Sequence, residues 1–176
     1  MKYVYIPRQE RDILNSVFVG EDFDEYKCRI EMEMHGWVEY ELEDIRKMSS
    51  VGDFFCVHFK DRIIPIQIVH KFPDGRMVCM PHNIIENCIF DENSNDYEKS
   101  YIRNYINSSK FKDNFDKKEL LDKIIPTDVP YLDRIIKKQE FFLPSHENVG
   151  FTNEDGILKP NTGSITFDYF KDDYPA

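Results

Sequence analysis

Between Tyr26 and Leu42 the sequence alternates between apolar and polar residues. Every even position except Gly36 holds an apolar residue or a cysteine, and many odd positions hold a glutamate. Strict alternation is typical of a half-buried β-strand, in which one face packs on a core and the other faces solvent. The pattern therefore predicts strands with one acidic face, formed by Glu31, Glu33, Glu39, Glu41 and Glu43.

The parity of the alternation predicts a β-hairpin with a three-residue loop at His35-Gly36-Trp37. Three-residue hairpin loops usually need one residue with a left-handed backbone, which glycine adopts without steric cost. This register places Glu33 opposite Glu39, and Glu31 opposite Glu41. Because directly opposed like charges destabilise a sheet, the predicted hairpin concentrates its charge at a cost in folding free energy.

Two interpretations of the acidic face are open. In the first, the glutamates are a solvated surface that protects the sheet against aggregation. In the second, they recognise basic groups, because a local field of one sign steers oppositely charged partners. Trp37 at the loop tip suits the second interpretation, since tryptophan is enriched at the energetic centres of protein interfaces.

The net charge of −10 is concentrated in this part of the chain. Ten acidic residues lie between Glu21 and Asp44, against Lys27 and Arg29. Binding to nucleic acid requires a basic patch for the phosphates, so we expect no direct contact with nucleic acid. A protein that itself holds nucleic acid is the kind of partner that such an acidic surface fits.

Length and composition place the chain among globular proteins. Its 176 residues suit one domain, or one domain with an appendage, and 41% hydrophobic residues suffice for a core. No run of 18 apolar residues and no signal-peptide pattern is present, which predicts a cytoplasmic protein without membrane contact. Four cysteines without a Cys-x-x-Cys pair indicate reduced thiols, and the scarcity of alanine suggests a low-GC bacterium or its phage.

The periodicity of the remaining chain predicts an α+β fold: an antiparallel sheet with packed helices, plus an N-terminal helix and the acidic β-hairpin. We expect the N-terminal helix and hairpin to form a module over residues 1–48, and the α+β domain to cover 49–176. The predicted strands are 54–59, 63–70 and 76–81. The predicted helices are 7–19, 96–108, 116–124 and a further one near 129–138. One buried cluster is expected from Phe55, Val57, Ile66, Ile68, Val78, Ile102, Ile106 and Leu143.

Four segments between about 51 and 170 resemble a known family. They are Val51-Gly52-Asp53, the strand pair through Ile63-Ile64-Pro65-Ile66, the stretch from Tyr97 to Asn107, and Phe141-Phe142-Leu143-Pro144-Ser145-His146-Glu147. They resemble a domain of unknown function of Firmicute and phage proteins, which looks distantly C-type-lectin-like, with the fold of formylglycine-generating enzymes. The resemblance implies a C-terminally shortened version of that fold. Within it we expect Arg103 to pair with Glu147, because a guanidinium matches a carboxylate.

No motif in the sequence carries a catalytic mechanism. Cys79-x-x-His82 with Cys88 is a poor zinc signature, because zinc sites normally show two ligand pairs. Ser145-His146-Glu147 holds the residue types of a triad, but triad members converge in space rather than in consecutive positions. We therefore expect no enzyme activity, no metal and no cofactor.

The sequence favours a non-enzymatic inhibitor. We expect it to block a basic, nucleic-acid-handling host protein, such as a CRISPR effector nuclease that holds nucleic acid in positively charged channels. The expected binding residues are Glu31, Glu33, Trp37, Glu39, Glu41 and Glu43. The alternative is a lectin-like ligand-binding module or a phage structural module.

Overall fold

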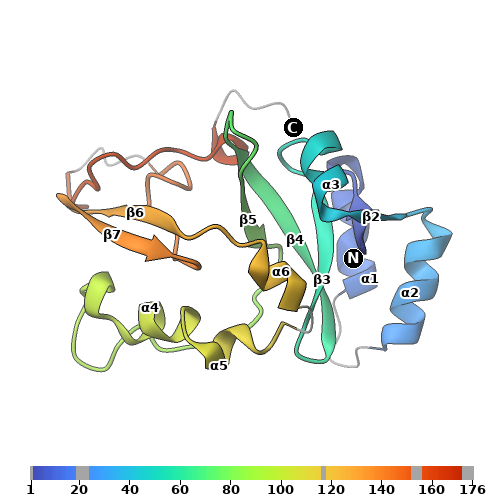
Figure 1. The fold of residues 1–176 in the computed structure, drawn as a ribbon, viewed down its shortest axis with the longest axis horizontal. Coiled ribbons are helices and arrows are strands. Elements are labelled where there is room, and N and C mark those ends of the chain that lie inside the picture. The colour runs from blue at the N-terminus through green and yellow to red at the C-terminus, as the bar shows by residue number, and fades with distance from the viewer. Residues whose placement is uncertain (1, 19–23, 116–117, 152–155, 172–176) are drawn as a thin grey trace. The chain divides into compact units, whose positions relative to one another are not determined.

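A five-stranded antiparallel sheet organises the first half of the chain (Figure 1). Its strand order is β2-β1-β3-β4-β5. The strands are β1 (Lys2–Ile6), β2 (Glu39–Glu41), β3 (Phe54–Phe59), β4 (Arg62–Lys71) and β5 (Met77–Pro81). The last three match the strands predicted from alternation and turn chemistry, and with the helices below they confirm the predicted α+β class.

The computed structural model describes residues 2–18, 24–115, 118–151 and 156–171. The chain forms two compact units. Unit 1 contains residues 1–85 with 115–117, and unit 2 contains residues 86–114 with 118–176. The sequence had suggested a division between residues 48 and 49. In the structure β1 pairs with both β2 and β3, so the N-terminal segment shares one sheet with residues beyond 49.

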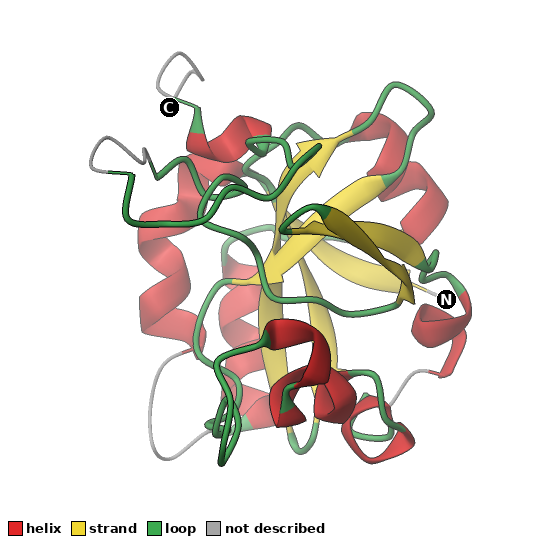
Figure 2. Ribbon diagram, turned by 90° about the vertical axis from the view of Figure 1, so that its left-hand side faces the viewer, coloured by secondary structure: helices red, strands yellow, loops and turns green. Residues whose placement is uncertain are grey.

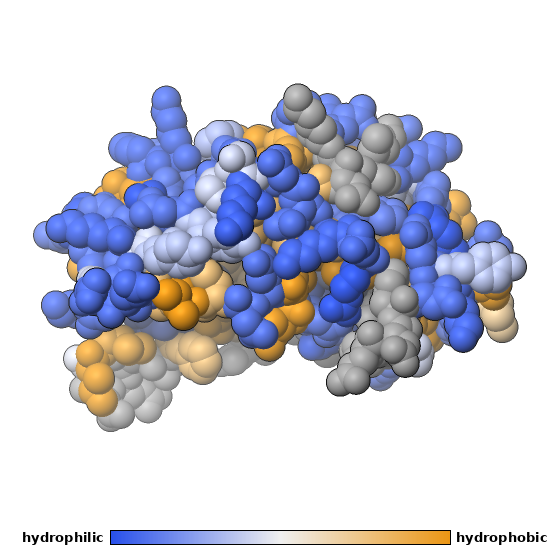
Figure 3. Space-filling view, turned by 90° about the horizontal axis from the view of Figure 1, so that it is seen from below, coloured by the Kyte–Doolittle hydropathy of each residue, from blue (hydrophilic) through white to orange (hydrophobic). Residues whose placement is uncertain are grey.

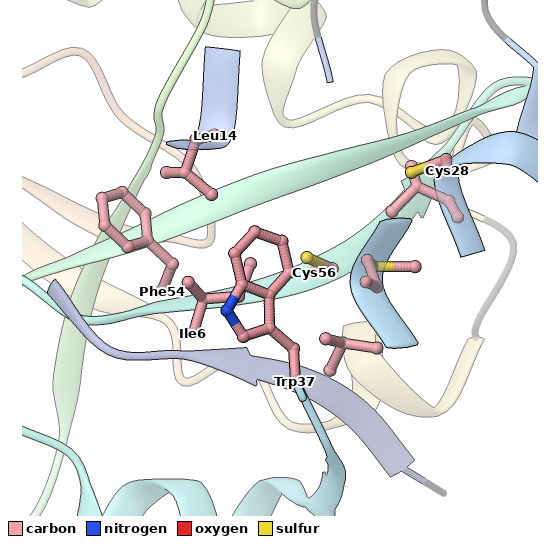
Figure 4. Close-up of a cluster of buried hydrophobic side chains, with 9 residues drawn as sticks. Ile6, Leu14, Cys28, Trp37, Phe54 and Cys56 are labelled. Atoms are coloured by element: carbon pink, nitrogen blue, oxygen red, sulfur yellow. The ribbon is translucent and has the colours of Figure 1, made fainter. Parts of the chain in front are cut away.

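Two helices cover one face of the sheet in unit 1, namely α1 (Arg11–Phe18) and α2 (Glu25–Met34). The described part of the predicted helix 7–19 is helical from residue 8, as a short 3-10 turn, η1 (Arg8–Glu10), that runs into α1. In Figure 4, Leu14 of α1 and Cys28 of α2 face a cluster that includes Ile6, Phe54 and Cys56 of the sheet. A third helix, α3 (Leu42–Met48), follows β2 and buries Ile45.

The predicted acidic hairpin is wrong, because residues 25–34 form α2 rather than a strand. Asp24 begins the helix by accepting the backbone N–H of Lys27, and Glu, Met, Lys and Arg are good helix formers. An alternating run also contains residues spaced by four, which lie on one helical face. Cys28 and Met32 form the buried face in this way, while Gly36 takes its left-handed backbone, φ 72°, just after the helix.

Unit 2 is built from short helices and one hairpin. Figure 2 distinguishes the helices of the chain, in red, from its strands, in yellow. The elements of unit 2 are η2 (Tyr97–Lys99), α4 (Tyr101–Ile106), α5 (Ser109–Lys112), α6 (Lys118–Asp122), β6 (Thr127–Tyr131), β7 (Arg134–Gln139) and η3 (Asp168–Phe170). The predicted helix 96–108 is present as η2 and α4. The predicted helix 116–124 corresponds to α6, although residues 116–117 lie outside the described part of the chain.

The helix predicted near 129–138 is instead the β6–β7 hairpin. Val129 pairs with Ile136, and Pro130 with Ile135, so β-branched residues occupy a paired surface that suits them. Leu132 has a left-handed backbone, φ 54°, and closes the turn. The expected single core is also divided: Phe55, Val57, Ile66 and Ile68 are buried in unit 1, whereas Ile102, Ile106 and Leu143 belong to unit 2, where none is fully buried.

Candidate protein-interaction surface

Helix α2 presents an apolar stripe to solvent. Tyr26, Ile30 and Met34 follow one another at four-residue spacing and are 74%, 39% and 76% exposed. On the opposite face Cys28 and Met32 are buried against the sheet. Uncovered apolar surface appears at the right-hand end of the space-filling view, where α2 lies (Figure 3). We call Tyr26, Ile30 and Met34 the α2 stripe.

Carboxylates accompany the α2 stripe. Glu31 and Glu33 lie on the same helix and are exposed. Glu31 lies 3.8 Å from the imidazole of His35, whereas Glu33 forms no ion pair with any residue that the structure describes. Nearer the start of the helix, Glu25 pairs with Arg29 at 3.0 Å. The end of α2 that carries Met34 is therefore the more negative end of the helix.

The other predicted acidic residues follow directly after α2. Glu39 and Glu41 are exposed on β2, which is an edge strand of the sheet, and Val38 beside them is 56% exposed. Within the described ranges Glu39 has no cationic partner at ion-pair distance. Glu43, in the first turn of α3, pairs with Arg46 and lies 3.8 Å from Lys47. The glutamates are thus exposed, but they are distributed over α2, β2 and α3 instead of opposing one another across a hairpin.

Trp37 is not at an exposed tip as predicted. Its side chain is buried in the core of unit 1 (Figure 4). Its indole N–H donates to the carboxylate of Glu10. The ring of His35 stacks on it, with centroids 4.9 Å apart. Trp37 therefore holds the segment after α2 against the sheet. The exposed apolar residues here are those of the α2 stripe, which the alternation had assigned to the core, and their four-residue spacing was the signal for their position.

Buried ionisable groups in unit 1 serve the architecture. The carboxylate of Asp53 accepts the Tyr5 hydroxyl and the backbone N–H groups of Arg8 and Ser50, at 2.9 and 2.8 Å for the two amides. Burial, with the hydrogen bond to Asp53, raises the pKa of Tyr5. The ammonium of Lys71 donates to the carbonyls of Arg46 and Ser49, and burial lowers its pKa. These contacts join β1 to the turn before β3, and α3 to β4.

The structure also places the other residues that the sequence singled out for chemistry. Among the described residues no group of three or more His, Cys, Asp or Glu side chains is placed to hold a metal ion. The Ser145 hydroxyl bonds to that of Ser164 at 2.9 Å, and Glu147 accepts two hydrogen bonds from Asn161, both at 2.8 Å. These bonds fasten a C-terminal segment to the loop at 145–148.

The expected ion pair between Arg103 and Glu147 is wrong. The guanidinium of Arg103 donates to the carbonyl of Glu98 and to the side chains of Gln139 and Asn104. Its partners are neutral oxygens near the start of α4 and at the end of β7. Arg103 thus joins the helix to the hairpin in unit 2.

A hollow of about 710 Å³ opens on the surface of unit 2. Tyr101 and Tyr105 of α4 line it with nearly parallel rings, whose centroids lie 5.9 Å apart at an interplanar angle of 8°. Glu86, Asp91, Glu92 and Lys110 also line it. We call this feature the tyrosine hollow. Nothing in the sequence pattern brought residues 86–92 and Tyr101 together, because the contact depends on a loop.

Comparison with known families matches residues 74–175 to a domain of unknown function, DUF6273. This segment is more than half of the chain, and the protein therefore belongs to that family. The match includes all of unit 2 up to residue 175, and it begins within unit 1 just before β5. No curated protein and no solved structure matches the chain. Among the described residues no helix is long and apolar enough to span a membrane.

Proposed function

We propose that this protein is a non-enzymatic inhibitor that binds a basic, nucleic-acid-handling protein, such as a CRISPR effector nuclease. The observation that carries the proposal is the α2 stripe, three exposed apolar side chains beside Glu33 and Glu39, which form no ion pair among the described residues. Helices that bind in grooves do so through apolar anchors at this spacing. The partner we propose therefore offers an apolar groove with a basic rim.

The charge around the stripe selects the kind of partner. Glu31, Glu33 and Glu39 give this end of unit 1 a negative field, which raises association rates with positive surfaces and disfavours acidic ones. Nucleic-acid channels are positively charged because they hold phosphates. An acidic face that docks there would exclude the nucleic acid. In this proposal the anchors determine the dissociation rate, and the carboxylates determine the association rate.

The biological setting belongs to the same proposal. We infer a low-GC bacterium or its phage as the source and the bacterial cytoplasm as the place of action. Composition supports this, since the chain is rich in lysine, asparagine and isoleucine and holds a single alanine. We also propose that the DUF6273 segment is distantly C-type-lectin-like.

Nuclease inhibition by matched variants tests the proposal. The protein is added to a purified CRISPR effector nuclease from a low-GC bacterium, and DNA cleavage is measured. Wild type should inhibit, and Ile30→Ser with Met34→Ser should inhibit at least tenfold less, because each removes an exposed apolar anchor. The control is Ile89→Ser with Ile157→Ser, which changes two exposed isoleucines of unit 2. Equal inhibition by both double variants, or none by wild type against a panel of such effectors, would refute the proposal.

The second candidate function is a lectin-like ligand-binding module or a phage structural module. The tyrosine hollow favours ligand binding, because two tyrosine rings line it and its volume lies within the range of about 300–1,000 Å³ that is typical of small-molecule sites. This candidate concerns unit 2 and is independent of the α2 stripe.

A further inference from the structure

We infer that the tyrosine hollow is a binding site for an organic cation, a ligand that carries one or more alkylammonium groups. The inference rests on the second candidate function and names its ligand class. It uses only contacts within unit 2.

The aromatic wall is held in place by hydrogen bonds. The Tyr105 hydroxyl donates to Glu86 at 2.5 Å, and this bond raises the pKa of Tyr105 to about 12. Tyr101 stacks in parallel on the Tyr105 ring and remains 45% exposed. The hollow thus has a positioned aromatic surface that is open to a ligand. The face of such a ring attracts cations through its quadrupole.

The charge of the lining favours a cation over an anion. Glu86, Asp91 and Glu92 contribute three carboxylates, against the single ammonium of Lys110. Asp91 is held ionised, because it accepts backbone N–H groups from Asn93, Ser94 and Tyr101 at 2.9–3.0 Å. These bonds lower the pKa of Asp91. A phosphate or carboxylate ligand would meet net repulsion here.

The same bonds give the hollow its shape. Asp91 joins the loop before α4 to the first residue of that helix, and Ile102 donates its N–H to the carbonyl of Phe90 at 3.1 Å. The loop with the acidic residues and the helix with the two tyrosines are therefore held together. A ligand that spans them can place an ammonium near Glu92 and a methylene chain on the Tyr101 ring. Free polyamines and lysine side chains of a peptide share this chemistry.

Titration of the full chain with spermidine, tri-lysine and neutral N-acetylglucosamine oligomers tests the inference. Binding is followed by calorimetry and by the NMR resonances of the Tyr101 and Tyr105 rings. One of the amines should shift both rings, and the neutral sugar should not. Tyr101→Leu should weaken amine binding about threefold to tenfold, the range of a partly exposed cation–π contact. Tighter binding of spermidine would identify a free polyamine as the ligand, and tighter binding of tri-lysine a peptide.

A second pair of variants tests the contribution of the carboxylates to amine binding. Glu92→Gln should weaken amine binding, and Asp133→Asn, an equal charge change on the β6–β7 turn, should not. If Tyr101→Leu does not fold, Glu92→Gln and the ring shifts of wild type decide the question. Amines that leave both rings unshifted, or an equal loss in Asp133→Asn, would overturn the inference. Sugar binding without amine binding would also overturn it, while leaving the lectin-like candidate standing. None of these results bears on the α2 stripe.

Discussion

The side chain of Asn107 pairs with the backbone of Phe141 as a neighbouring strand would. Its amide nitrogen donates to the Phe141 carbonyl at 2.9 Å, and its oxygen accepts the Phe141 N–H at 3.2 Å. The same oxygen accepts the N–H of Glu140 at 3.0 Å. One residue at the end of α4 thus satisfies the backbone of the segment that leaves β7. This geometry gives a structural reason for the asparagine in the motif at 97–107.

Asn107→Ala should destabilise unit 2 by about 1–3 kcal/mol, because it leaves half-buried backbone groups without their partners. Native-state hydrogen exchange measures this at the Phe141 amide, which should exchange faster in the variant. Asn104→Ala is the matched control, since Asn104 makes one exposed contact with Arg103. An unchanged Phe141 exchange rate in Asn107→Ala would contradict the proposed anchoring.

Trp37→Ala should lower the stability of unit 1 by about 3–5 kcal/mol, as expected for removing a large buried side chain. The substitution empties a site that contacts both helices and the sheet. Chemical denaturation followed by circular dichroism gives the free energy of unfolding. Met34→Ala, three residues earlier on the exposed face of α2, should change that free energy by less than about 1 kcal/mol. Equal effects of the two substitutions would show that the burial of Trp37 contributes little.

The order of thiol modification should follow burial. Cys88 is exposed, whereas Cys28 and Cys56 are buried in unit 1. Burial raises the pKa of Cys28 to about 11, so its thiolate is scarce at neutral pH. In the native protein Cys88 should react with a thiol reagent first, and Cys28 and Cys56 should react only after unfolding. Mass spectrometry of partly modified protein identifies the order, and early modification of Cys28 would contradict it.

Acid should remove the contribution of Asp91 to stability. Backbone donors lower its pKa in the folded state, so its contribution is complete above the ordinary aspartate pKa and is lost as the pH falls through the folded value. The melting temperature of wild type should therefore approach that of Asp91→Asn as the pH falls below about 4. A constant gap between wild type and Asp91→Asn would refute the assignment.

The sequence predicts strands correctly where an apolar run is bounded by turn residues on both sides. Apolar residues of β3 and β4 lie between clear turns, and the structure confirms these strands. The sequence predicts a strand instead of a helix at residues 26–34, because apolar residues at even positions fit both the two-residue period of a strand and the four-residue spacing of one helical face. The N-cap at Asp24, which accepts the backbone N–H of Lys27, favours the helix. The exposure of the glutamates follows from the local pattern. The burial of Trp37 depends instead on packing against residues of β1, α1, α2 and β3, and its indole N–H donates to Glu10, 27 residues earlier in the chain. The tyrosine hollow likewise depends on a loop that periodicity does not describe.

Removing two carboxylates beside the α2 stripe should slow association with the partner without weakening the fold. Glu33→Gln with Glu39→Gln removes charges that form no described ion pair, so the melting temperature should stay the same or rise. At low ionic strength the association rate should fall about threefold to tenfold, and its dependence on salt should become shallower, because screening acts on fewer charges. The dissociation rate should change little.

Surface plasmon resonance with the basic partner immobilised on the chip measures the association and dissociation rates. Asp61→Asn with Asp133→Asn removes the same charge from two exposed turns and is the control for net charge. Tyr26→Ser with Met34→Ser should show the opposite behaviour, with a faster dissociation rate and an association rate close to wild type, because apolar anchors act after the encounter. If the double glutamine variant associates as fast as wild type at low salt, the glutamates are only a solvated surface. The proposed electrostatic recognition of a basic partner would then be abandoned.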